Sequence, residues 1–225
     1  MTTTPLQPTA RTSLRRSKER AATEREALYD VLRNGMFCHL GVVVDGDPLV
    51  LPTAYGVDLD RGPDGTLYLH GSVAARSVVA APERTVCVTV THADGLVLAR
   101  SAFHHSVNYR SAVVLGRARL VTDLEEKRAA LRQFTNHVVP GRWDEVRPIT
   151  DQEIRGTAVL ALPIEEASAK VRTGPPLDDA EDLQWPVWAG VVPLSTTAGD
   201  LVPDAQVLPG VTPFDRERLR ERGRS

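Results

Sequence analysis

The chain has 225 residues, of which 42% are hydrophobic and 25% are charged, and this composition excludes a chain that is disordered throughout. Lys and Arg number 27 against 29 Asp and Glu, so the net charge of -2 provides no basic field for nucleic-acid binding. No apolar run approaches the roughly 18 residues that span a bilayer, and no apolar signal segment is present at the N-terminus. We therefore expect a cytoplasmic protein that binds neither nucleic acid nor membrane.

The first part of the chain predicts one short helix followed by β-strands. Residues 1–22 have no apolar period and are expected to form a flexible, unpacked tail. Thr23 and Glu26 match a capping box that begins a helix, and Gly35 suits its C-terminal end. Asp45-Gly46 provides a turn between strands predicted at 36–44 and 49–57. A strand at 66–70 and a short helix at 73–81 follow.

The rest of the chain continues the β pattern up to about residue 164. Period-two alternation predicts a strand at 85–92, a turn at 93–95, and further strands at 96–102, 110–121 and 157–164. Thr122 and Glu125 match a second capping box, which begins a helix that ends before Pro140. Strands dominate without regular βαβ alternation. We therefore predict a mostly β fold, an antiparallel barrel with helical insertions, and a loose chain after Pro193.

Cysteine and histidine patterns give no sign of a disulfide or a metal site. Cys38 and Cys87 both lie in apolar stretches, which predicts free thiols that pack as small hydrophobic residues. His104-His105 is the one place where a metal is conceivable. Adjacent strand residues point to opposite faces, and no acidic residue or cysteine lies nearby at ligand spacing, so no metal site is expected.

The segment from His70 to Ser77 has the chemistry of a phosphate site. A predicted strand ends at His70, Gly71 permits close backbone approach, Ser72 is a potential N-cap, and Arg76 follows in the first helical turn. Backbone N–H groups at a helix N-terminus, joined by a guanidinium, bind a single phosphate well. A plain strand-to-helix turn with a solvated arginine has the same local pattern, so both interpretations stay open.

Five sequence blocks, in this order and spacing, resemble a known family. They are Cys38-His39-Leu40-Gly41, Leu51-Pro52-Thr53-Ala54-Tyr55, Leu67-Tyr68-Leu69-His70-Gly71-Ser72 with Arg76, Val86-Cys87-Val88-Thr89-Val90, and Ser106-Val107-Asn108-Tyr109-Arg110-Ser111 with Gly116. Together they resemble the pyridoxamine 5′-phosphate oxidase-like flavoproteins, near the branch that contains the nitroimidazole-resistance flavoproteins. The resemblance implies a domain at 23–194 that is a six-stranded antiparallel split β-barrel and binds FMN at a homodimer interface. Residues 195–225 are then a C-terminal extension.

The resemblance also implies a set of cofactor-binding residues. Ser72, Arg76 and Ser77 match positions that hold the FMN phosphate, and His70 with Gly71 lines the path to it. The isoalloxazine strand corresponds to Leu51, Pro52, Thr53 and Tyr55; Arg110 and Ser111 correspond to the strand supplied across the dimer interface; and Trp188 corresponds to an aromatic that closes over the flavin. Candidates for the substrate side are His104, His105, Asn108, Tyr109 and Lys170, and no catalytic residue is assigned.

The function implied is an FMN-dependent oxidoreductase, which passes electrons from a reduced nicotinamide or a small reductant to a small organic acceptor. One alternative is a protein that stores or senses flavin without turnover, and another is a split barrel that holds a deazaflavin or a haem. True pyridoxamine 5′-phosphate oxidases carry an Arg-x-His-x-Arg-like signature near the C-terminus. Residues 214–220 contain no histidine, so oxidation of pyridoxamine phosphate is not expected.

Overall fold

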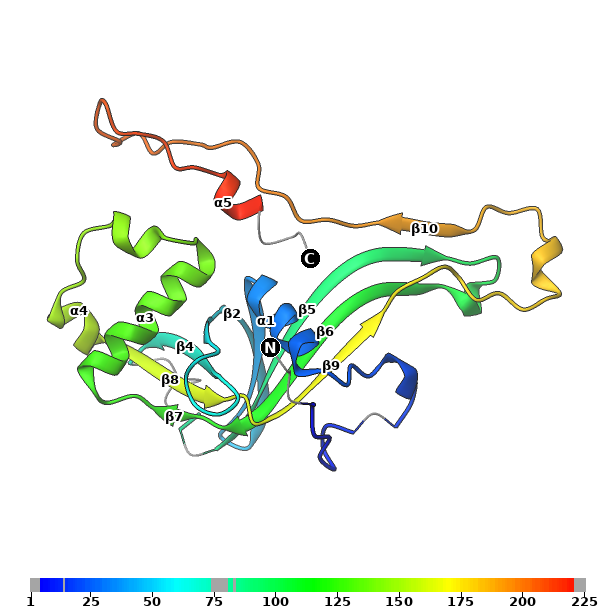
Figure 1. The fold of residues 1–225 in the computed structure, drawn as a ribbon, viewed down its shortest axis with the longest axis horizontal. Helices are drawn as coiled ribbons and strands as arrows, with labels where there is room; N and C mark the ends of the chain where they lie inside the picture. Colours follow the sequence, from blue (N-terminus) through cyan, green and yellow to red (C-terminus); the bar gives the residue numbers. More distant parts are fainter. Residues whose placement is uncertain (1–4, 14, 74–80, 83, 221–225) are drawn as a thin grey trace.

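The computed structural model describes residues 5–13, 15–73, 81–82 and 84–220, and its body is built from two antiparallel sheets (Figure 1). The six-stranded sheet has the order β2-β1-β5-β6-β9, with β10 also paired to β5, and the four-stranded sheet has the order β3-β4-β8-β7. The strands are β1 (Phe37–Val44), β2 (Asp47–Ala54), β3 (Gly56–Asp58), β4 (Thr66–Ser72), β5 (Thr85–Leu98), β6 (Ser106–Arg117), β7 (Arg119–Leu120), β8 (Thr157–Pro163), β9 (Glu166–Arg172) and β10 (Gly190–Pro193).

The helices of the described residues are η1 (Lys18–Arg20), α1 (Arg25–Asn34), η2 (Ala102–His104), α3 (Leu124–Val138), η3 (Arg142–Glu145), α4 (Asp151–Gly156), η4 (Asp182–Gln184) and α5 (Glu217–Arg220). Apart from α1 and α3, they are short. The prediction of a mostly β fold with helical insertions is therefore confirmed. No pairing between described strands closes the two sheets into a ring, so the six-stranded split barrel stays a prediction. The helix predicted at 73–81 lies almost wholly outside the described residues.

The hairpin of β1 and β2 follows from its turn residues. Asp45 and Gly46 both have positive φ, 52° and 94°, as a two-residue turn that matches the twist of a hairpin requires. Val44 pairs with Asp47, and the register runs to Phe37 opposite Ala54. The single strand predicted at 49–57 is wrong at its end, because β3 turns away after residue 54 and pairs with β4 in the other sheet.

β5 and β6 form one long ribbon, and the turn predicted at 93–95 is wrong. The chain continues through this point as a β-bulge, where Ala93 pairs with Tyr109 and Gly95 with Asn108. Beyond the bulge the ribbon leaves the body, and β10 runs antiparallel along β5 (Figure 1). We call residues 94–108 and 173–193 the distal arm.

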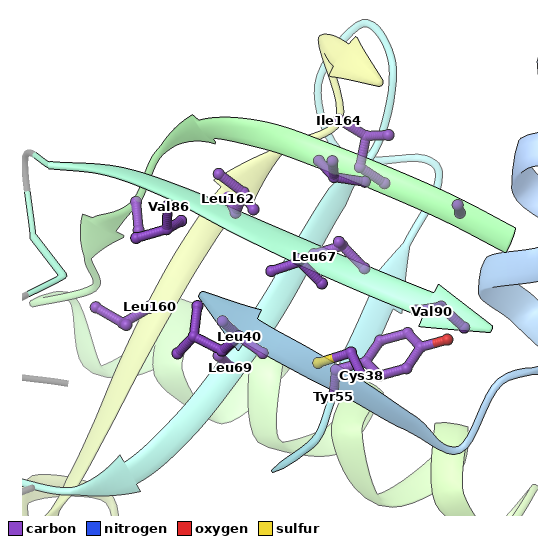
Figure 2. Close-up of a cluster of buried hydrophobic side chains, with 14 of the residues drawn as sticks. Cys38, Leu40, Tyr55, Leu67, Leu69, Val86, Val90, Leu160, Leu162 and Ile164 are labelled. Atoms are coloured by element: carbon purple, nitrogen blue, oxygen red, sulfur yellow. The ribbon is translucent and has the colours of Figure 1, made fainter. Parts of the chain in front are cut away.

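The main core lies between the two sheets (Figure 2). Val86, Val88 and Val90 point inward from one face of β5, and Leu160 and Leu162 meet them from β8. Cys38 is fully buried in this cluster, and burial raises the pKa of its thiol to about 12. Both cysteines are free thiols, as predicted.

Gly35 follows α1 for a reason different from the one its position suggested. Its φ of -76° is not left-handed, so it is not a helix-terminating glycine of the usual kind. A Cβ at this position would lie 2.5 Å from Cγ1 of Val90 and 2.6 Å from the hydroxyl oxygen of Tyr55. Close packing of the helix end against the core therefore requires glycine here.

Both predicted capping boxes are wrong by one residue. The N-cap of α1 is Glu24, without a side-chain cap bond, and the N-cap of α3 is Asp123, whose carboxylate accepts from the backbone N–H of Glu126. A true capping box occurs at Thr150 and Glu153, at the start of α4.

The N-terminal segment packs on β9, against the expectation of an unpacked tail. Thr9 and Arg11 both contact the carboxylate of Glu166, and Thr12 is buried. These contacts lower the pKa of Glu166. The backbone N–H of Ala22 donates to the carbonyl oxygen of Ala169 at 3.0 Å, so the segment is held on the strand at two points.

Candidate functional site

The end of β4 holds the histidine that the sequence placed beside the cofactor. His70 is half-buried, opposite Val159 of β8, and its ring lies 4.0 Å from the ring of Phe134 on α3 in an edge-on arrangement. Burial lowers the pKa of His70, which keeps the imidazole neutral at physiological pH. Its Nδ1 is buried and has no hydrogen-bond partner among the described residues.

The other histidines differ from His70 in their contacts. Ring nitrogens of His92, His105 and His137 donate to the carbonyl oxygens of Val31, Ser101 and Gly35, and His104 pairs with Asp179. His39 lies exposed on β1. A buried polar atom without a partner costs about 1–3 kcal/mol. His70 is therefore the histidine whose environment calls for a ligand.

The remaining residues predicted to contact the flavin have different outcomes. Gly71 and Ser72 follow His70 at the end of β4, but Arg76 and Ser77 lie outside the described residues. Leu51, Pro52 and Thr53 are on β2, the edge strand of its sheet, and keep part of their surface exposed.

Tyr55 is a core residue. Its side chain has no exposed surface, its hydroxyl donates to the carbonyl oxygen of Leu32 at 2.6 Å, and its ring lies 4.5 Å from that of His137. The hydroxyl thereby satisfies a carbonyl at the end of α1, and we find the side chain within the core rather than on the strand surface.

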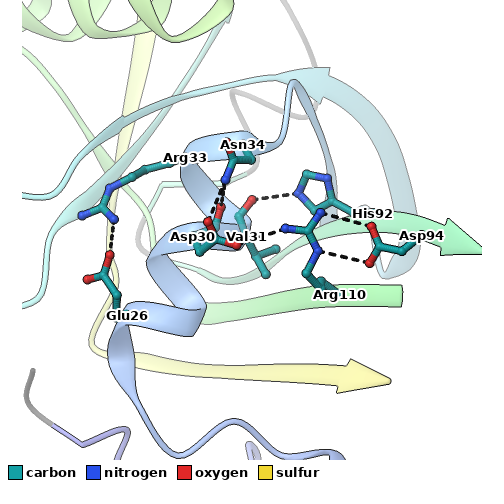
Figure 3. A network of polar contacts seen from close by, with 8 residues as sticks. All are labelled: Glu26, Asp30, Val31, Arg33, Asn34, His92, Asp94 and Arg110. Carbon is teal, nitrogen blue, oxygen red and sulfur yellow. Dashed lines mark hydrogen bonds and ion pairs between the residues drawn. The ribbon is translucent and has the colours of Figure 1, made fainter. Parts of the chain in front are cut away.

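Arg110 is held by two carboxylates of its own chain (Figure 3). Nε and Nη2 donate to the two oxygens of Asp94 at 3.1 Å each, and Nη1 donates to Asp30 at 3.0 Å. These hydrogen bonds raise the pKa of Arg110. The guanidinium thus ties α1 to the bulge at the base of the distal arm, and a flavin contact across a dimer interface stays a prediction. Ser111 pairs with Thr91 and Lys170 on the neighbouring strands.

The distal arm carries the predicted residues farthest from the body. Trp188 precedes β10 and is 64% exposed. His104 ends the short helix η2 rather than lying on a strand, and its Nε2 is 3.1 Å from Oδ2 of Asp179. Donor atoms of His104, Asp179 and Asp182 all lie within 4.8 Å of one another. The argument that no acidic residue is near His104 therefore holds along the sequence but not in space.

Three of the substrate-side candidates lie on neighbouring strands with a residue that the sequence did not reveal. Asn108 and Tyr109 are on β6, Lys170 is on β9, and Arg172 ends β9 directly opposite Tyr109. Arg172 is only 8% exposed. No local signal marks it, because the apolar positions of β9 are mainly alanines and the strand was not predicted.

Comparison with known proteins agrees with the fold. The family model described as pyridoxamine 5′-phosphate oxidase matches residues 24–171. The chain belongs to this family. No curated protein matches the chain. No described helix is long and apolar enough to cross a membrane.

Two solved structures match this family member over almost its whole length. The flavocytochrome Anf3 from Azotobacter vinelandii is 41% identical, with a TM-score of 0.86 over 96% of this chain and 98% of that one. The FAD and haem binding protein from Mycobacterium smegmatis is 35% identical, with a TM-score of 0.80 over 91% of this chain and 97% of that one. A putative 5-nitroimidazole antibiotic resistance protein from Bacteroides thetaiotaomicron shares the fold at 23% identity and a TM-score of 0.56, over 67% of this chain and 86% of that one.

Proposed function

We propose that this protein is a flavocytochrome-type oxidoreductase that binds a flavin and a haem. The observation that carries the proposal is similarity at 41% and 35% identity, over nearly the full length of both partners, to proteins described as a flavocytochrome and as an FAD and haem binding protein. The matched region includes most of the chain beyond residue 171, where the family model ends. FAD is therefore favoured over the FMN that the sequence led us to expect.

The described residues fit a haem at one place, His70. Histidine side chains commonly hold haem iron in proteins, and His70 would do so here. His70 is neutral, and its ring has a buried nitrogen without a partner. The edge-on contact with Phe134, with ring centroids 4.0 Å apart, restricts how the imidazole can rotate.

The chain's contribution would be to bind and orient the two groups. Half-exposed residues of β2 and the end of β4 are the candidates for the flavin, as the family resemblance implies. When bound, a flavin supplies hydride and single-electron transfer and a haem supplies one-electron chemistry. A reduced nicotinamide as the electron donor and a small organic acceptor complete the proposed activity.

Absorbance spectroscopy of the purified full-length protein tests the proposal. We expect both a flavin spectrum and a Soret band, and chromatography of the released flavin should identify FAD. His70→Ala should lose the haem while it retains the flavin. The matched control is His39→Ala, which removes an exposed histidine on β1 of the other sheet and should keep both groups.

Each other outcome is informative. If the protein binds flavin alone, it is a flavoprotein without haem. If the released flavin is FMN, the cofactor expected from the sequence is correct. Haem retention in His70→Ala would move the iron ligand to another residue. Bound flavin that is reoxidised no faster than free flavin would favour storage or sensing.

The homodimer and the lack of pyridoxamine phosphate oxidase activity belong to the same proposal. The distal arm exposes apolar side chains, among them Phe103, Trp185 and Trp188. These side chains support a dimer in which a second copy of the chain packs against them. Light scattering should therefore give a dimer. A cytoplasmic location and failure to oxidise pyridoxamine phosphate remain expectations from the sequence.

A further inference from the structure

Arg172 is a buried cation whose hydrogen bonds go only to neutral groups. Its Nη1 donates to the amide oxygen of Asn108 and, at 3.4 Å, to the carbonyl oxygen of Gly174, and its Nη2 donates to the carbonyl oxygen of Pro175 at 3.4 Å. Asn108 is also buried and donates its own amide to Gly174 at 3.1 Å. The guanidinium is therefore held by three neutral groups, and no carboxylate of the described residues neutralises it.

This arrangement differs from that of the other buried arginine. Arg25, 6% exposed, lies 3.3 Å from the carboxylate of Asp64. Within the described part of the chain, Arg172 has no carboxylate partner. Burial of a charge is unfavourable unless the charge is paired. Its Nε–H and one Nη2–H also lack an acceptor among the described residues, so donors remain for an incoming group.

Further cations surround this position. Burial lowers the pKa of Arg172, and Arg20, which precedes the residue that pairs with Lys170, lowers it further by repulsion. Its own partner, Glu19, is 3.7 Å away and mostly exposed. Lys170 lies two residues before Arg172, on the same face of β9, and its ammonium makes no hydrogen bond or ion pair with a described residue. The phenol of Tyr109 faces Arg172 across the strand pair.

We propose that Arg172, with Arg20 and Lys170 beside it, binds the carboxylate or phosphate group of an acidic ligand. The site joins a guanidinium fixed by Asn108 to two more cations and a phenol, and oxyanions are the groups that such donors recognise. Three sources supply this chemistry: a flavin phosphate, a haem propionate and a free phosphate ion. The first two rest on the proposed function, and the third does not.

Binding measurements on the full chain with paired ligands distinguish these sources. One pair is FAD against riboflavin, a second is haem against haem dimethyl ester, and the third is inorganic phosphate against chloride at equal ionic strength. Loss of hydrogen bonds to a charged group weakens binding about ten- to hundredfold. We expect Arg172→Gln to weaken binding of the acidic ligand of one pair by this factor and to leave the affinity for its neutral counterpart unchanged.

Controls separate recognition from folding. Arg172→Lys should retain part of the affinity because it retains the charge. Lys170→Gln and Arg20→Gln, which change exposed or half-buried side chains, should weaken the same ligand by a smaller factor. Arg155→Gln removes one positive charge from an exposed position on α4 and should change nothing.

The proposal is overturned if no acidic ligand binds more tightly than its neutral counterpart, or if all these variants bind every ligand as the wild type does. Equal weakening of an acidic ligand and its neutral partner in Arg172→Gln would assign the residue to the structure of the turn at 173–175 alone. If neither flavin nor haem binds, the proposed function fails, and the phosphate pair still tests Arg172.

Discussion

Strands β5 and β6 run through both the body and the distal arm, yet their apolar residues are covered less completely in the arm. In the body, Val86 and Val90 of β5 are each 1% exposed, because they belong to the core cluster between the two sheets. Beyond the bulge, Val97 is still fully buried, but its neighbour Leu96 is 41% exposed, and Phe103 in η2 is 88% exposed. Alternation along a strand thus does not by itself produce burial; a second layer must cover the strand. The stability of a single chain should therefore reside in the body.

The largest expected effect comes from a core truncation. Leu162→Ala removes a fully buried side chain between the sheets and should lower the free energy of unfolding by about 2–5 kcal/mol. Leu183→Ala, the same change at a 58% exposed position on the distal arm, should cost less than about 0.5 kcal/mol. Urea denaturation of both variants measures the difference. Similar losses at the two positions would contradict the division into body and arm.

Glycine substitution tests the tight contact at the end of α1. Gly35→Ala places a methyl group against Val90 and Tyr55 and should destabilise the protein by roughly 1–3 kcal/mol through overpacking. Gly199→Ala is the control, because an added Cβ there meets no atom within 4 Å. Thermal unfolding of the two variants is the measurement. If Gly35→Ala leaves the thermal stability unchanged, the side chains around residue 35 can move to accept the methyl group.

The junction between body and arm depends on Arg110. Arg110→Met leaves Asp30 and Asp94 without their shared cation, and we expect a loss of roughly 1–2 kcal/mol, between the values for exposed and buried charged hydrogen bonds. Arg33→Met removes an exposed pair with Glu26 on the same helix and should have a much smaller effect. Equal effects in chemical denaturation would mean that the network contributes no more than a surface ion pair.

The smallest effect concerns the helix caps. Thr150→Ala removes the capping box of α4 and should cost about 1 kcal/mol. Thr122→Ala changes the residue that the sequence pattern named as a cap, but Asp123 holds that role, so little change is expected. The pair therefore compares a cap present in the structure with one present only in the sequence pattern. A larger loss of stability in Thr122→Ala than in Thr150→Ala would mean that Thr122, and not Asp123, caps α3.

Sequence reasoning succeeded where one local interaction decides the structure. The hairpin of β1 and β2 was predictable because Asp45-Gly46 allows positive φ at both turn positions. It failed at 93–95, where similar turn residues form a bulge, since pairing with β6 on one side and β10 on the other keeps the strand extended. β9 was missed because Ala167 and Ala169 give a weak apolar signal.

For the candidate site, too, only the residues with a local sequence signal could be predicted. His70 was identified because it ends a predictable strand next to Gly71 and Ser72. The proximity of His104 to two aspartates, and of Arg172 to Arg20, depends on residues far apart in the chain, which no local pattern contains.

The buried thiol of Cys38 has a practical consequence. With its pKa near 12, almost none of this cysteine is thiolate at neutral pH while the protein is folded, and the thiolate is the form that alkylating reagents attack. Modification of Cys38 thus requires the sheets to separate first. The rate at which a thiol reagent labels this single position reports how often the core opens, and it does so without any engineered probe.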